Sequence, residues 1–106
     1  MRLMPDGLRL EARKGMKLAF QDATNTCGGM SWRFAYDLDD PATWWTHVDE
    51  HGVRERFWSG IKPGDVVYDV GAGVGSYTLP ALARGAAHVY AWSPDPRTPG
   101  FILPSL

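Results

Sequence analysis

The sequence carries three closely spaced glycines directly after a short, continuously apolar run. Val66, Val67 and Tyr68 form that run, and the segment from Asp69 to Gly75 reads Asp-Val-Gly-Ala-Gly-Val-Gly. A continuous apolar run is typical of a parallel strand that helices cover on both faces. The glycines therefore predict a tight loop at the carboxyl end of such a strand, where a nucleotide-type cofactor would contact the backbone.

The surrounding residues predict one right-handed βαβ unit, the smallest element of a doubly wound sheet. Its expected parts are a strand over 66–70, a crossover helix over 76–84 and a second strand over 88–92. In the helix, Leu79, Leu82 and Ala83 are the expected core residues, and Gly85 is the expected C-terminal stop. The predicted fold class is therefore α/β, with a Rossmann-like core.

The residues ahead of this unit predict a small β hairpin. Alternating apolar and polar side chains indicate strands over 8–12 and 16–20, joined by a turn at Lys14-Gly15. The polar stretch 21–31 is expected to be a loop, and 32–36 to be a further strand. This part of the chain is expected to serve as scaffold.

A helix is expected between the hairpin and the βαβ unit. Asp40 suits its N-cap and Pro41 its first position, and Gly52 would end or kink it before a short second helix over 53–58. The expected apolar face comprises Trp44, Trp45 and Val48. Three units are thus predicted: an N-terminal β extension (1–38), a helical lead-in (39–60) and a truncated Rossmann-like cofactor-binding unit (61–106).

Composition limits the possible partners. The chain has 106 residues, enough for one domain, and its 11 Lys and Arg nearly cancel its 12 Asp and Glu. Neither nucleic acid nor an anionic membrane is therefore expected as a partner. No apolar run approaches the roughly 20 residues of a membrane span. The single cysteine, Cys27, cannot form an internal disulfide and fits a reducing compartment, so a cytoplasmic location is expected.

The spacing of the glycines discriminates between cofactors. A dinucleotide fingerprint requires G-x-G-x-x-G, whereas here the third glycine comes one residue early and Ser76 stands in its place. Asp69 would repel a pyrophosphate but would balance the ammonium and sulfonium charges of S-adenosylmethionine. The alternative is that Asp69 accepts hydrogen bonds from the loop itself and that the glycines only shape a turn.

The stretches 62–79 and 89–96, together with the upstream Asp40-Pro41 and Trp44-Trp45 pairs, resemble the FkbM family of class I methyltransferases. This resemblance implies a Rossmann-like fold that binds S-adenosylmethionine, and a small-molecule hydroxyl acceptor such as a sugar or secondary metabolite. The cofactor-binding residues it implies are Asp69, Gly71, Ala72, Gly73, Gly75, Tyr77 and Thr78, with Ser93 and Asp95 near the ribose.

Two features depart from the family pattern. Ser93 stands where the family has an acidic residue for the ribose hydroxyls, and the nearest acid is Asp95. The prolines of the last 13 residues disfavour the next crossover helix. These are Pro94, Pro96, Pro99 and Pro104. An incomplete sheet, the N-terminal portion of an enzyme and a homo-oligomer are therefore expected, and no catalytic base is assigned.

Two alternatives stay open. The chain could be a non-catalytic remnant or binding module, or a Rossmann protein that uses a nicotinamide cofactor. His47-Val-Asp-Glu-His51 also matches the H-x-x-E-H pattern of zinc proteases. Because Gly52 interrupts the helix at once and no third ligand is evident, no metal is expected there.

Overall fold

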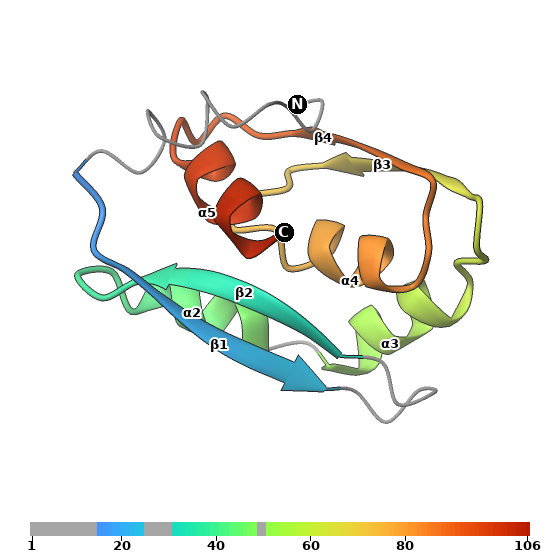
Figure 1. Ribbon diagram of the computed structural model, residues 1–106, viewed down its shortest axis with the longest axis horizontal. Helices are drawn as coiled ribbons and strands as arrows, with labels where there is room; N and C mark the ends of the chain where they lie inside the picture. Colours follow the sequence, from blue (N-terminus) through green and yellow to red (C-terminus); the bar gives the residue numbers. More distant parts are fainter. Residues whose placement is uncertain (1–14, 25–30, 49–50) are drawn as a thin grey trace.

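The computed structural model describes residues 15–24, 31–48 and 51–106. These residues form a small α/β domain with two two-stranded sheets and four helices (Figure 1). The strands are β1 (Leu18–Thr24), β2 (Ser31–Asp37), β3 (Val66–Val70) and β4 (His88–Trp92). The helices are α2 (Ala42–Val48), α3 (His51–Ser59), α4 (Thr78–Ala83) and α5 (Thr98–Ser105).

The predicted βαβ unit is present. Strands β3 and β4 pair in parallel, with Val66 opposite His88 and Val70 opposite Trp92, and α4 connects them. The inner face of this sheet packs in a cluster with α4 and the segment before β3. Its buried members are Ile61, Val67, Ala81 and Val89. As predicted, Gly85 follows α4 with a positive φ of 101°, a conformation that glycine adopts without strain.

The antiparallel sheet differs from the predicted hairpin. Strand β1 pairs with β2 in a register that runs from Leu18 opposite Asp37 to Thr24 opposite Ser31. Residues 21–24, expected in a loop, therefore belong to a strand; polar Gln21 and Asp22 are exposed there, as an edge strand allows. The predicted strand over 32–36 is confirmed. The predicted strand over 8–12 lies outside the described residues.

Helices α4 and α5 lie between the two sheets (Figure 1). Ala35 of β2 is fully buried against Val74 and Phe101, and Phe34 belongs to a cluster with Leu79 and Ile102. The core is thus built between β2 and the two helices that follow the parallel strands. This packing positions the glycine loop, because Val74 and Ala72 of that loop are themselves buried.

The expectation that prolines prevent a helix after β4 is wrong. Helix α5 has Pro99 in its first turn. The N–H groups of a first turn have no partner within the helix, so proline costs no hydrogen bond there. Pro104 lies in the last turn, so it removes one hydrogen bond close to the helix end. Phe101, Ile102 and Leu103 are at most 1% exposed, and their burial outweighs that loss.

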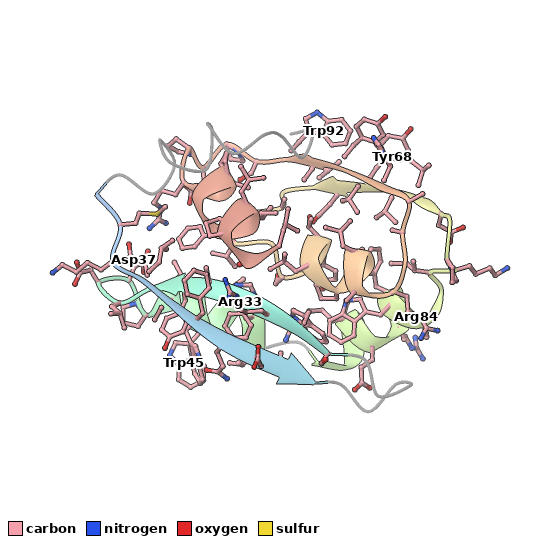
Figure 2. All side chains as sticks on the ribbon, in the orientation of Figure 1. Arg33, Asp37, Trp45, Tyr68, Arg84 and Trp92 are labelled. Carbon is pink, nitrogen blue, oxygen red and sulfur yellow. The ribbon has the colours of Figure 1, made fainter. Side chains whose placement is uncertain are left out.

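The buried face of α2 is not the predicted one. Thr43 and His47 are buried, whereas Trp45 is 55% exposed and projects outward in Figure 2. The tryptophan pair instead packs edge to face at 4.9 Å, and the Trp44 indole donates to the Gln21 side chain at 2.9 Å. A polar partner on β1 thus holds Trp44 half-buried at the rim of the core.

Two further expectations about helix ends and faces need correction. Gly52 does not end a helix, because it belongs to the first turn of α3. A buried arginine, Arg54, joins the two helices by donating to the carbonyls of Thr46 and His47 in the last turn of α2. In α4, Leu79 is buried as expected, but Ala83 is exposed because the helix ends there.

Candidate functional site

The carboxylate of Asp69 is bound by the helix that follows it. Asp69 lies near the carboxyl end of β3 and is half-buried, and the Thr78 hydroxyl donates to its Oδ2 at 2.6 Å. Thr78 is fully buried in the first turn of α4. Thr78 therefore orients the carboxylate and is itself shielded from any ligand.

The glycine loop has the conformation that only glycine adopts freely. Gly71, Gly73 and Gly75 have φ values of 86°, 53° and 90°. The backbone N–H groups of Gly71 and Ala72 both donate to the Trp92 carbonyl, at 2.7 and 2.8 Å. The loop is therefore hydrogen-bonded to the end of β4, which brings the carboxyl ends of both parallel strands together.

The three glycines have different structural roles. Among the described residues, a Cβ added at Gly71 would meet no atom within 4 Å, and one at Gly73 would meet a backbone oxygen at 4.0 Å. A Cβ at Gly75 would lie 2.7 Å from Ile102 Cγ1. Gly75 thus allows α5 to pack closely, whereas Gly71 and Gly73 leave open space beside the loop.

A pocket of about 240 Å³ opens at the carboxyl end of β4. It is lined by Trp92, Ser93, Asp95, Pro96, Thr98 and Pro99. Thr98 is 2% exposed, and its hydroxyl has no hydrogen-bond partner among the described residues. A buried hydroxyl without a partner is costly. Because the Thr98 hydroxyl is enclosed by protein, Ser93 and Asp95 are the polar side chains that this pocket presents to a ligand. The volume is below the roughly 300–1,000 Å³ of whole-ligand pockets and suits one part of a ligand.

Asp95 is held by Arg97, a residue that belongs to none of the predicted motifs. The guanidinium of Arg97 contacts both Asp95 carboxylate oxygens at 3.1–3.3 Å and reaches Asp40 Oδ2 at 3.0 Å. Hydrogen bonding from Arg97 lowers the pKa of Asp95, and the two carboxylates raise the pKa of Arg97. Asp95 is therefore ionised and paired with Arg97 before any ligand arrives.

Ser93 lies at the pocket, whereas Tyr77 packs against α3. Ser93 lines the pocket, where its Oγ accepts a hydrogen bond from the Asp95 N–H at 3.2 Å, so its own O–H can donate to a ligand. Tyr77 packs edge to face on Phe57 of α3, with ring centroids 5.3 Å apart. The structure thus brings Ser93 and Asp95 together at the pocket, and Tyr77 contacts the lead-in helix.

The two histidines of the H-x-x-E-H pattern belong to different helices. His47 is buried on α2 and stacks on Phe34 with ring centroids 4.0 Å apart, and His51 begins α3. Burial, followed by the positive charge of Arg54, lowers the pKa of His47 to about 3. His47 therefore stays neutral as part of the core. Across the described ranges, no three His, Cys, Asp or Glu residues are grouped as metal ligands.

The sequence contains only weak indications of Arg97 and Thr98, the two site residues that were not predicted. Asp95 and Arg97 are two residues apart, a spacing that allows an ion pair within one turn, but the partner Asp40 is 57 residues away. Thr98 begins α5, the helix that the prolines argued against. Sequence reasoning could have found the Asp95–Arg97 pair, but the bridge to Asp40 and the orientation of Thr98 depend on tertiary packing.

Comparisons with known proteins leave the family open. No protein-family model matches the chain, and searches of curated proteins and of solved structures found no match. None of the helices in the described part of the chain has the length and apolar character needed to cross a membrane.

Proposed function

We propose that this chain is the cofactor-binding portion of an S-adenosylmethionine-dependent methyltransferase of the FkbM type. The observation that carries the proposal is the glycine loop at the carboxyl ends of two parallel strands, where Gly71 and Gly73 have positive φ and open space beside them. In open α/β sheets, ligands bind at this edge because backbone N–H groups and helix ends converge there.

The residues around the loop fit this cofactor in two respects. The half-buried carboxylate of Asp69, held in place by Thr78, would attract the ammonium group of the methionine part. The pocket beyond β4 offers the hydroxyl of Ser93 to the ribose, and its walls contain Trp92 and Pro96. Hydroxyls in place of a free carboxylate predict weaker adenosine binding, because one hydroxyl accepts fewer and weaker hydrogen bonds.

When bound, S-adenosylmethionine supplies a methyl group that passes to an acceptor oxygen by in-line displacement. In this proposal the residues of the chain contribute orientation and charge balance, which account for much of the catalysis of such transfers. A small hydroxyl compound is the proposed acceptor, and a cytoplasmic location is part of the same proposal. No residue is assigned as a base.

The test is binding of S-adenosylhomocysteine, the stable product, to Gly71→Ala and to a matched control. Gly64→Ala is the control because Gly64 has a similar φ of 90° against 86° for Gly71, and at both positions no atom of the described part of the chain lies within 4 Å of an added Cβ. Both variants carry the same backbone strain, so their folding should be affected alike. By calorimetry, Gly71→Ala should weaken binding at least about tenfold and Gly64→Ala should not. Equal binding by the two variants would refute the proposed site.

A second candidate is a binding module that holds a partner without catalysis. The observation in its favour is that Asp95 is already neutralised by Arg97, which leaves the ribose position without a free acid. Binding of S-adenosylhomocysteine separates the two: a module that recognises only another macromolecule would give no heat with this compound at any concentration.

A further inference from the structure

The outer face of the parallel sheet is apolar and exposed, although it belongs to the most regular part of the fold. Its members, which we call the aromatic face, are Val66, Tyr68, Val70, His88, Tyr90 and Trp92. Tyr68 is 66% exposed, Val70 82% and Trp92 47%. Figure 2 shows Tyr68 and Trp92 projecting away from the helices that cover the inner face. Parallel strands are normally covered on both faces, and none of the described helices and strands covers this one.

The rings on this face are already arranged in a stacked row. The ring centroids of Tyr68 and Tyr90 are 5.5 Å apart with planes 16° from parallel, and those of Tyr68 and Trp92 are 5.9 Å apart at 11°. Side chains that hold one another in place lose little rotamer freedom when a partner arrives. The face is therefore preorganised for contact with a second surface.

The charge and the exposed area of the aromatic face indicate which kind of surface would bind it. The aromatic face contains no acidic residue, lysine or arginine, and the whole chain has a formal net charge of −1. A two-fold interface places a patch against itself, so an uncharged patch avoids the repulsion that any charge would cause. With roughly 150–250 Å² for each aromatic side chain, the exposed part of the face is on the order of 500 Å². Two copies would together bury about 1,000 Å², the lower end for a specific interface.

We propose that two copies of this chain associate through their aromatic faces, sheet against sheet, in a two-fold symmetric dimer. The small interface predicts a dissociation constant in the micromolar range. A small ligand would not cover this face, because the face spreads over both strands and small-molecule sites are concave. The inference does not rest on the proposed cofactor: Trp92 borders both this face and the pocket beyond β4, but the other five members of the face do not line that pocket.

The test compares one substitution at two exposed valines. Val70→Lys places a charge on the aromatic face, and Val53→Lys places the same charge on α3, where Val53 is 62% exposed. Sedimentation velocity over a range of concentrations gives the dissociation constant for the full chain and each variant. We expect Val70→Lys to raise that constant at least about tenfold, because like charges then meet across the two-fold axis, and Val53→Lys to leave it unchanged.

Other outcomes would overturn the inference. A full chain that stays monomeric up to the highest soluble concentration would do so. Dimers that persist in Val70→Lys would show pairing elsewhere, for example at the strand edges, and equal loss in both variants would show an interface that includes α3. If circular dichroism shows that Val70→Lys fails to fold, Tyr68→Gln replaces it, since an exposed tyrosine that becomes glutamine keeps the strand and removes a stacked ring.

Discussion

Replacing Gly75 by alanine is expected to destabilise the chain more than the same change at Gly64. Both glycines have a φ of 90°, so each alanine costs about 1–2 kcal/mol of backbone strain. At Gly64 an added Cβ has no described atom within 4 Å, but at Gly75 it lies 2.7 Å from Ile102 Cγ1. Overpacking of this kind adds about 1–3 kcal/mol, so Gly75→Ala should cost about 2–5 kcal/mol in total.

A double-mutant cycle with Ile102→Ala separates the two contributions. Ile102 is fully buried, and its truncation removes the atom that the new methyl group would meet. In urea unfolding followed by circular dichroism, Gly75→Ala should cost about 1–3 kcal/mol less in the Ile102→Ala background than alone. Gly64→Ala should cost the same in both backgrounds. Equal costs for the two glycines, or no coupling between Gly75 and Ile102, would refute the close packing of α5 on the glycine loop.

Three further predictions concern charge. The folded state resists protonation of His47, whose pKa is about 3, so stability is complete above the ordinary histidine pKa of about 6.5 and falls below it. From pH 7.5 to 5.5, urea unfolding should show a loss of about 1.4 kcal/mol that His47→Phe lacks; equal losses would contradict this. Ser93→Glu should tighten S-adenosylhomocysteine binding about fivefold in calorimetry, with Ser93→Gln as the control. If Ser93→Glu weakens binding and Asp95→Ala abolishes it, Asp95 is the ribose ligand. In Arg97→Gln, the pKa of Asp95 should return toward its ordinary value in an NMR titration, and an unchanged pKa would show that Arg97 is not its cause.

Local signals were sufficient to predict the βαβ unit. A short apolar run followed by a glycine-rich turn is typical of a buried strand, and glycines with positive φ are favoured where a strand turns sharply into a helix. Val66–Val70 and His88–Trp92 are therefore found at their predicted positions. Gly75 also allows close packing, because a Cβ added there would meet Ile102 of α5.

The remaining errors share a physical cause. Polar residues 21–24 form a strand because β2 pairs with them, and Pro104 is tolerated in α5 because Phe101 and Ile102 are buried beside it. Both depend on contacts distant in sequence. Propensity differences of a fraction to a few kcal/mol per residue are overridden by such packing. The same holds in the candidate site, where Arg97 reaches Asp40 on a segment 57 residues away.

The proposed cofactor site is tested most directly by an NMR titration of the isotope-labelled chain with S-adenosylhomocysteine, and separately with NAD. We expect S-adenosylhomocysteine to cause saturable chemical-shift changes at the amides of Gly71, Gly73 and Ser93. The amide chemical shift of a residue on the aromatic face, such as Tyr68, should not change. NAD should cause weaker shifts, because Asp69 opposes a pyrophosphate at this loop. Stronger binding of NAD, or shifts with S-adenosylhomocysteine that leave the glycine loop unaffected, would contradict the proposed function.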